Sequence, residues 1–354
     1  MNEKKKVATM TFSYSQNLGC LLQMYALQDY IKQLGYECQC IRFKEFDNHP
    51  FETIKGIPDG LSDILYYGKS KEKNRKINDY RNKYIDFTDK TYQNSDEMGE
   101  LNDQYDIFVA GSDQIWNVHK GIIEEFFLPF VKSDKKKIAY AASFGLSKLP
   151  DEYRDPVKER IKSFNAISIR ESSGVKIVED LLEETVPQTI DPVFLLNRDK
   201  WETLCPERRI EDKYIFVYPT QISKELKSIV KQAKEKLNCK VYSLFYFWGV
   251  DKVIKDADPL DFINYIRYAE LVVGSSFHAT AFAIIFEKNL RVIPHSSTGA
   301  RVVNLLTDLG LQEKCLPAAG ESLKIDPIDY TEANKQLVEM IERSKQYLVN
   351  ALAN

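Results

Sequence analysis

Apolar runs and amphipathic stretches alternate along almost the whole chain. Residues 6–12 are a first apolar run, and residues 38–43 alternate between apolar and polar side chains as a strand does. Between them, residues 21–34 repeat their apolar positions with the period of a helix, which ends at Gly35, a typical helix stop. The opening segment therefore predicts the strand, helix, strand unit from which parallel sheets are built.

Further short apolar runs end in small or polar residues. In the first half they cover residues 105–110, 137–142 and 166–170, and a short strand is also expected at residues 186–190. The second half repeats the alternation of strands and helices, at residues 214–218, 223–237, 239–244, 259–268, 271–273, 276–286, 290–293 and 301–309. Ligands of open parallel sheets bind beyond the carboxyl ends of the strands, so these ends are where a site is expected.

Two successive halves of this kind predict an α/β protein with two Rossmann-like domains that face a cleft. We expect an N-terminal domain over residues 1–196, a C-terminal domain over residues 210–329 and a last helix, residues 330–354, that packs across both. The charged linker between the domains contains Pro206. Residues from about 49 to 101 are polar with weak helical periodicity, which predicts a peripheral helical insertion in the first domain.

The composition narrows the class of protein. The chain has 354 residues, 44% of them apolar, with 49 Lys and Arg against 52 Asp and Glu. This is enough for about two domains with full-sized cores, and it excludes a disordered chain or a coiled coil. The net charge of −3 argues against a nucleic-acid partner, because affinity for a phosphate backbone needs clustered Lys and Arg.

Nothing in the sequence indicates export or membrane insertion. The longest apolar run, residues 279–286, is far shorter than the roughly 18 residues that span a bilayer. The first residues lack the apolar core of a secretory signal, and the six cysteines are scattered without a CxxC pair, as reduced thiols usually are. We expect a cytoplasmic protein.

Several motifs that carry cofactor or metal chemistry are absent from the sequence. It has no G-x-G-x-x-G, no phosphate-binding G-x-x-x-x-G-K-[ST], no G-x-S-x-G and no H-E-x-x-H. Its four histidines are not spaced with each other or with cysteine as a zinc site requires. The sequence therefore predicts transfer chemistry without a metal ion or a bound cofactor.

The strongest candidate site lies in residues 271–286. An apolar strand is followed by Gly274, Ser275 and Ser276, and then by a helix that has His278 in its first turn. Free amides at a helix start and two hydroxyls can bind a phosphate or a carboxylate. The alternatives are that the serines simply cap the helix and that the histidine is structural.

A highly charged ligand at that helix start needs additional cations, since the helix dipole contributes only about 0.3–1 kcal/mol per charge. Arg170, at the end of a predicted strand, and Arg301, at the start of a predicted helix, are the candidates. A guanidinium group binds carboxylate or phosphate in a bidentate manner. The alternative for Arg170 is an ion pair at the surface or between the domains.

Residues 110–117 (AGSDQIWN) form a second polar turn after a strand. Its carboxylate and amides, in Asp113, Gln114 and Asn117, suit the hydroxyl groups of a sugar. The alternative is that Asp113 caps a helix.

Residues 14–23 (YSQNLGCLLQ) form a third turn, in which Asn17 and Gly19 precede a helix that contains Gln23. These three residues are further candidates for acceptor binding, and ordinary helix capping is the alternative.

The aromatic run at residues 241–248 (VYSLFYFW) has two interpretations. It can stack on sugar faces, or it can be a buried strand and its edge, which is the more common arrangement.

Seven segments occur in the same order as in a known protein family. They are residues 17–27 (NLGCLLQMYAL), 106–117 (DIFVAGSDQIWN), 140–145 (YAASFG), 167–173 (ISIRESS), 191–196 (DPVFLL), 275–279 (SSFHA) and 301–311 (RVVNLLTDLGL). On these segments the chain resembles the polysaccharide pyruvyl transferase family over almost its full length.

The resemblance implies a GT-B-like pair of lobes and the transfer of pyruvate from phosphoenolpyruvate onto two hydroxyls of a sugar as a cyclic ketal. It also implies that His278 and Arg170 belong to the donor site. On this hypothesis Ser275, Ser276 and the two arginines hold the donor anions, His278 donates a proton, and Asp113 accepts one from the sugar.

The acceptor is a sugar, an oligosaccharide or a lipid-linked glycan. A lipid-linked acceptor would bring the protein to the cytoplasmic face of the inner membrane, where residues 135–137 or the aromatic run are candidate contacts. Two other functions remain open at this point. One is a GT-B glycosyltransferase that uses a nucleotide sugar, and the other is a non-catalytic glycan-binding protein.

Overall fold

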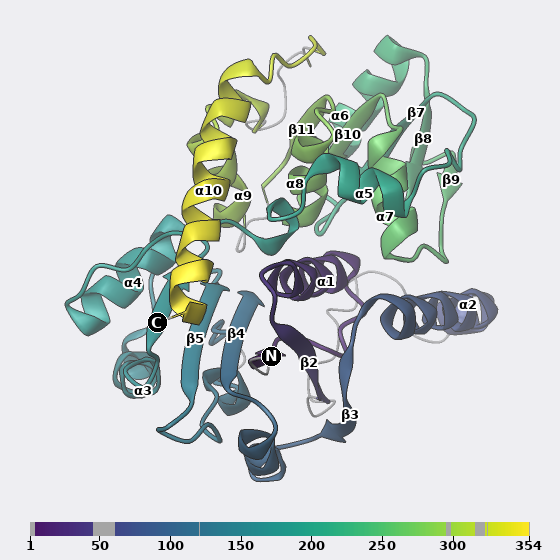
Figure 1. The fold of residues 1–354 in the computed structure, drawn as a ribbon. Coiled ribbons are helices and arrows are strands. Elements are labelled where there is room, and N and C mark those ends of the chain that lie inside the picture. The colour runs from purple at the N-terminus through teal and green to yellow at the C-terminus, as the bar shows by residue number, and fades with distance from the viewer. Residues whose placement is uncertain are drawn as a thin grey trace.

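The computed structural model describes residues 4–44, 61–119, 121–294, 299–315, 323 and 325–353, without the side chains of residues 61–70. Within these ranges the chain forms two parallel sheets flanked by helices (Figure 1). The predicted α/β class is confirmed. Residues 45–60, which contain part of the expected insertion, lie outside the described ranges.

The first sheet has six strands in the order β3-β2-β1-β4-β5-β6. They are β1 Lys6–Met10, β2 Glu37–Phe43, β3 Phe87–Tyr92, β4 Ile107–Asp113, β5 Lys136–Ala142 and β6 Ala166–Ile169. All neighbours pair in parallel. The central strands β4 and β5 are buried along almost their full length, which explains their continuous apolar runs.

The second sheet has five strands in the order β11-β10-β7-β8-β9. They are β7 Tyr214–Tyr218, β8 Lys240–Ser243, β9 Lys252–Val253, β10 Leu271–Gly274 and β11 Leu290–Val292. These neighbours also pair in parallel. The carboxyl ends of all strands of one sheet therefore meet at one edge.

The helices follow or connect these strands. They are α1 Leu18–Gln33, α2 Leu61–Tyr84, α3 Asp151–Ile161, α4 Ser172–Leu182, α5 Arg198–Leu204, α6 Lys224–Leu237, α7 Pro259–Arg267, α8 Phe277–Ile285, α9 Ala300–Asp308 and α10 Thr331–Ala353. Short 3-10 turns are η1 Glu97–Asp103, η2 Glu124–Phe127, η3 Pro192–Phe194 and η4 Gln312–Lys314. No helix of the described ranges combines the length and apolarity needed to cross a bilayer.

Helix α1 is buried on nearly all sides, because it lies between the first sheet and helices of the second half (Figure 1). The Tyr25 ring on α1 contacts Trp201 of α5 at 5.8 Å between centroids, and Trp201 contacts Phe282 of α8 at 5.0 Å. One hydrophobic cluster therefore includes side chains of both halves. A helix that is apolar all round is stable only when it is enclosed in this way.

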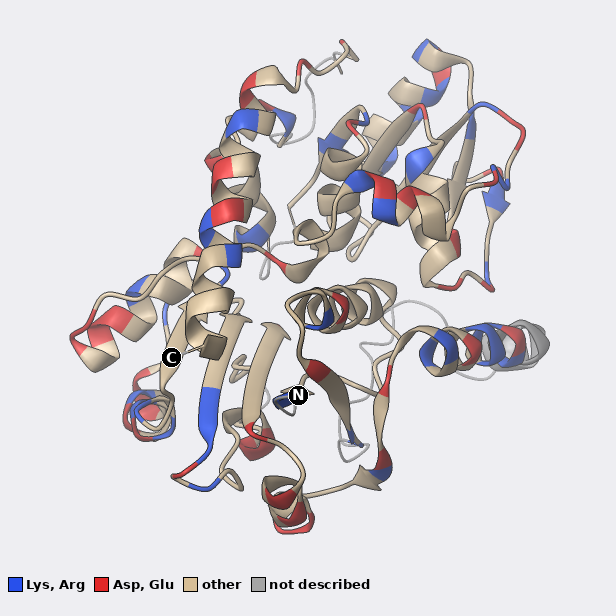
Figure 2. Ribbon diagram, viewed as in Figure 1, with Lys and Arg blue, Asp and Glu red and all other residues tan. Residues whose placement is uncertain are grey.

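The last helix, α10, runs beside both sheets (Figure 1). Its Tyr347 hydroxyl donates to the carbonyl of Ala139 in β5 at 2.9 Å. Toward its start, the side-chain amide of Asn334 donates to Glu287, between α8 and β11, at 2.7 Å. Charged side chains gather on outer helices such as α2, while the strands carry few apart from the start of β5 (Figure 2).

The expected helical insertion at residues 49–101 is wrong in one respect. Residues 87–92 form β3, which pairs with β2 as the edge strand of the first sheet. Its centre, Asp89 and Lys90, is exposed, so the sequence there has no apolar alternation that would indicate a strand. The expected strand at residues 186–190 is reduced to one bridge between Ile169 and Gln188.

Candidate active site

Charged side chains from both halves of the chain meet between the carboxyl edges of the two sheets: Asp113, Arg170, Asp191, His278 and Arg301. The first two stand at the ends of β4 and β6, and Asp191 immediately precedes η3. His278 and Arg301 lie in the first turns of α8 and α9. Strand ends and helix starts of a parallel sheet share one edge, which explains how distant segments converge.

The Asp191 carboxylate connects the two halves. Its Oδ2 accepts a hydrogen bond from Arg170 Nη1 at 2.6 Å and lies 3.6 Å from Nε2 of His278, while Oδ1 accepts from the Val193 amide at 3.1 Å. Full burial alone raises the pKa of this carboxyl, but His278, Arg170 and the amide outweigh burial and lower the pKa to about 2. Asp191 is therefore an anion at any physiological pH.

Asp113 is the second buried carboxylate. Its Oδ1 lies 3.5 Å from Arg170 Nη2 and 3.7 Å from Arg301 Nη1. Burial raises the pKa of Asp113, yet the nearby cations, Arg170 first among them, bring it below its ordinary value. The residue has a left-handed backbone with φ of 76°, a conformation that aspartate tolerates better than most residues.

Both arginines lie against the Phe277 ring. The guanidinium carbons of Arg170 and Arg301 are 4.8 Å and 5.9 Å from its centroid, a cation–π geometry that fixes the two planes. The Nε atoms of both arginines and Nε2 of His278 are buried and without a hydrogen-bond partner among the described residues. Unsatisfied buried donors of this kind are costly unless a ligand completes them.

The pKa values of the two arginines shift in opposite directions. Burial lowers the pKa of Arg301 to about 10, and the charge of Arg170 adds to this effect. For Arg170 burial is outweighed by Asp191 and Asp113, and the pKa rises. Arg301 is thus the less compensated cation, and it is still charged at neutral pH.

Four helices begin at this site, and among the described residues only two of them have a side-chain cap. Asn17 Oδ1 accepts from the Gly19 and Cys20 amides at the start of α1, and Ser276 caps α8. No side chain of the described ranges accepts from the first amides of α4 or α9. Amides at a helix start can bind an anion, and here they lie beside Arg170 and Arg301.

Gly19 brings α1 directly against the catalytic candidate His278. A Cβ atom on Gly19 would lie 2.2 Å from both Cγ and Nδ1 of the imidazole. Only glycine allows this approach, so Gly19 helps to set the position of the His278 ring.

The three donor-site candidates before α8 have structural partners. Ser275 Oγ accepts from the Thr220 amide at 2.7 Å, and Ser276 caps the helix. A Cβ on Gly274 would lie 2.3 Å from the Tyr218 carbonyl oxygen in β7. The structure thus gives Ser276 the capping role that the sequence left as an alternative and makes Ser275 a hydrogen-bond partner of Thr220. Neither serine lines the narrow pocket beside the charged cluster, and His278 and Asp113 do not line it either.

The acceptor-site candidates are also held by the protein, with one exception. Asn117 donates to the Phe144 carbonyl at 2.6 Å, and Gln23 donates to Thr11 and accepts from the Ser112 amide. The Nε2 atom of Gln114 is buried without a partner among the described residues. Gln23 therefore supports the turn before Asp113 rather than facing a ligand.

A narrow pocket opens beside the charged cluster. Residues of both halves line it, among them Arg170, Glu171, Asp191, Phe277, Arg301 and Asn304. No group of three or more His, Cys, Asp or Glu in the described ranges is arranged to hold a metal ion.

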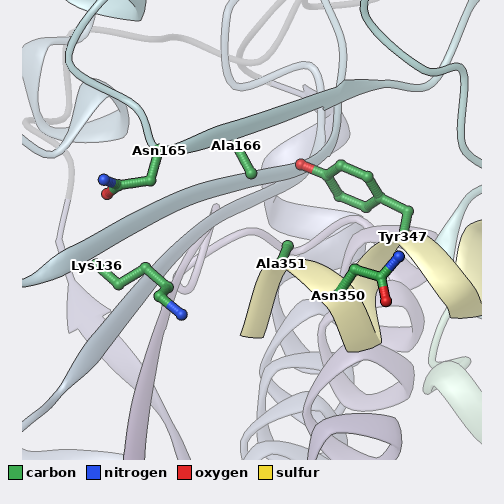
Figure 3. A pocket seen from close by; sticks show the side chains of 6 residues that line it. All are labelled: Lys136, Asn165, Ala166, Tyr347, Asn350 and Ala351. Carbon is green, nitrogen blue, oxygen red and sulfur yellow. The ribbon is translucent and has the colours of Figure 1, made fainter. Parts of the chain in front are cut away.

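A larger hollow lies elsewhere, where α10 ends against the start of β5 and β6 (Figure 3). Its polar groups dock the helix: Lys136 Nζ donates to the Leu352 carbonyl and the Tyr347 hydroxyl to Ala139. It is at the amino ends of the strands, away from the charged cluster, and we do not regard it as the active site.

Sequence reasoning missed Asp191, Phe277 and Glu171 as site residues. Asp191 lies in the DPVFLL segment, which marked a boundary between the halves, and Phe277 stands between two residues that were singled out. Glu171 Oε1 accepts from the Phe144 and Gly145 amides at 2.9 and 3.0 Å. The carboxylate of Glu171, next to Arg170 in the sequence, was the available signal.

The two parallel sheets, with a charged pocket between their carboxyl edges, form the predicted α/β architecture, which is GT-B-like. Residues 17–297 match the family described as polysaccharide pyruvyl transferase. The chain belongs to this family.

Solved structures with the same fold have very different sequences. A candidate UDP-N-acetylglucosamine 2-epimerase of Listeria monocytogenes has 9% identity and a TM-score of 0.51, over 98% of this chain and 90% of that one. The UDP-GlcNAc 2-epimerase of Methanocaldococcus jannaschii has 10% identity and a TM-score of 0.51, over 96% and 92%. A glycosyltransferase of Rickettsia africae has 10% identity and a TM-score of 0.49, over 99% and 100%. No curated protein matches the sequence.

Proposed function

We propose that this protein transfers pyruvate from phosphoenolpyruvate onto two hydroxyls of one sugar of a glycan, and forms a cyclic ketal in the synthesis of a bacterial surface polysaccharide. The observation that carries the proposal is the convergence of Arg170, Arg301 and His278 on two buried carboxylates. Phosphoenolpyruvate is a cytoplasmic metabolite, so the reaction takes place in the cytoplasm, at the inner membrane face if the acceptor is lipid-linked.

The donor binds as a carboxylate and a phosphate on one small vinyl group. Arg170, Arg301 and the uncapped amides of α4 and α9 hold these anions. These groups neutralise the departing phosphate without a metal ion or a bound cofactor, so activity withstands EDTA.

His278 starts the reaction as a general acid. Its imidazolium protonates the methylene carbon, and C2 becomes an oxocarbenium-like electrophile. One sugar hydroxyl adds to C2, and then the bond between C2 and the phosphate oxygen breaks. The second hydroxyl closes the ketal on C2. Of the two hydroxyl protons, one restores the imidazolium and the other leaves with phosphate, so atoms and charges balance.

Asp113 receives the proton of the attacking hydroxyl and passes it to the departing phosphate, while the proton of the second hydroxyl restores the imidazolium. Its contacts with the two arginines keep its pKa low, which makes it a weak base before the donor binds. When the donor anions take over those arginines, the carboxylate loses its counter-charges and its basicity rises. Donor binding thus prepares the base for the acceptor.

The test combines phosphoenolpyruvate with a panel of glycan acceptors and measures both inorganic phosphate and a pyruvate adduct by mass spectrometry. Coupled appearance of the two supports the proposal. Sugar transfer from a nucleotide sugar, with no use of phosphoenolpyruvate, would establish the glycosyltransferase alternative. Glycan binding with no release of phosphate across the panel would leave a non-catalytic binding protein.

A further inference from the structure

The loop after β8 exposes two aromatic rings on a rigid base. Tyr246 and Trp248 are 64% and 75% exposed, whereas Phe247 between them is only 4% exposed. The Phe245 ring packs on Tyr218 of β7 at 5.5 Å between centroids, and its amide donates to the Ser243 hydroxyl at 3.1 Å. Because Phe245 and Phe247 are anchored in this way, the rings of Tyr246 and Trp248 between and after them are held outward.

These rings lie at the edge of the sheet that carries the active site. Strand β7 separates β8 from β10, and Ser243 pairs with Val217, which pairs with Val273. Two strand spacings of about 4.8 Å place the end of β8 about 10 Å from the end of β10, which leads to His278. Tyr246 and Trp248 stand three and five residues beyond the end of β8, so a ligand that reaches from His278 to these rings must extend over more than one sugar ring.

The charges around the loop favour a neutral ligand over a membrane. Residues 245–258 contain three aspartates and two lysines. Asp251 pairs with Lys234 at 2.5 Å. An anionic lipid surface requires a cluster of Lys and Arg, which this segment lacks, whereas flat aromatic faces suit the apolar faces of sugar rings.

We propose that Tyr246 and Trp248 form a subsite that stacks on a sugar of the acceptor other than the one that receives pyruvate. The acceptor is then an oligosaccharide or a polymer rather than a free monosaccharide. The inference deepens the proposed pyruvyl transfer and rests on it for the identity of the acceptor.

Tryptophan fluorescence tests binding without activity. Trp116 and Trp201 are 1% and 0% exposed, so acrylamide quenches mainly Trp248. With neutral gluco-, galacto- and manno-oligosaccharides as probes, we expect quenching to fall about twofold, and the corresponding monosaccharides to have no effect. Trp248→Phe removes the quenchable signal and serves as the control. Unchanged quenching with all oligosaccharides overturns the subsite.

Kinetics provide the second measurement. Trp248→Ala and Tyr246→Ala each raise the KM for an oligosaccharide acceptor about tenfold, or about 1.4 kcal/mol, and leave the KM for phosphoenolpyruvate unchanged. Tyr246→Phe keeps the ring and restores the KM. Unchanged acceptor KM values in both alanine variants contradict the proposal.

The two proposals fail in different ways. Shielding of Trp248 by oligosaccharides without phosphate release retains the subsite and removes pyruvyl transfer. Pyruvyl transfer without shielding does the reverse. If vesicles that contain phosphatidylglycerol shift the Trp248 emission to the blue while oligosaccharides leave it unchanged, the loop is a membrane contact and the subsite is excluded.

Discussion

The carboxylate of Asp191, in the first half of the chain, lies 3.6 Å from the imidazole of His278, in the second half. The same oxygen binds Arg170 at 2.6 Å. One buried carboxylate thus holds both a candidate acid and a candidate donor-binding cation. The imidazole reaches this carboxylate only when the two halves are docked.

We expect Asp191→Asn to weaken both the fold and the reaction. The change removes the closest counter-charge of the buried Arg170 and leaves it the more distant Asp113, which costs about 3 kcal/mol in the free energy of unfolding. It also releases the imidazole, so kcat falls about 100-fold. Urea unfolding and steady-state kinetics measure the two effects. Asp199→Asn, at an exposed position, is the control, and equal kcat values in the two variants would contradict the role of Asp191.

The pKa of Asp191 predicts how stability depends on pH. Its folded pKa is about 2, below the ordinary value of 3.8. Above about pH 5 the carboxyl is ionised in both states and its stabilisation is complete. As the pH falls from about 5 toward 2, the unfolded state gains the proton first and the stabilisation is lost. Urea midpoints should therefore fall more steeply with acid in the wild type than in Asp191→Asn.

His278→Ala should lower kcat by about 10²–10⁴-fold, because the methylene carbon of the donor loses its acid. Circular dichroism should show an unchanged fold. The exposed His119 provides a matched control in His119→Ala. Near-normal turnover of His278→Ala would refute its assignment.

Arg301→Gln should raise the KM for phosphoenolpyruvate about tenfold or more and change stability little, since Arg301 has only a loose contact with Asp113 at 3.7 Å. Arg170→Gln should raise the same KM and also destabilise the fold, because it breaks a close buried pair with Asp191. Arg198→Gln, at an exposed position, is the control. An effect of Arg301→Gln on the acceptor KM alone would place the donor elsewhere.

Gly19→Ala tests how α1 positions the imidazole. The new methyl group would lie 2.2 Å from the ring, so the ring or the helix must shift, and kcat should fall about 100-fold, as expected when the general acid is displaced. Gly99 has no atom within 4 Å of the equivalent position, and Gly99→Ala should be fully active. Normal kinetics of Gly19→Ala would show that the ring tolerates displacement.

The parallel core of both sheets was predictable because its strands and helices carry strong apolar patterns. Helix α8 begins at Phe277, one residue after the expected start at 276. Helix α1 ends at Gln33, one residue before the expected end at 34. Helix α3 was missed, since only Val157 and Ile161 of it are buried and Pro156 interrupts it. Such a pattern is too weak to distinguish a helix from a loop.

The charged side chains of the site were largely predictable, but their partners were not. Arg170, His278, Arg301 and Asp113 stand at strand ends or helix starts, where parallel sheets place ligands. The strand expected directly before Asp191 is only one bridge in the structure. The role of Asp191 arises from contacts with residues 21 and 87 positions away. Tertiary proximity of that kind has no local sequence signal. The serines were predicted to bind the donor because hydroxyls that cap a helix and hydroxyls that face a ligand occur in the same pattern.

Helix α10 has a mechanical consequence. It is hydrogen-bonded to β5 near its end and to the segment between α8 and β11 near its start. The lobes therefore cannot simply separate along the line that joins them, because one stiff rod is attached to both. We therefore expect any opening between the lobes to hinge near α10 rather than to separate them evenly.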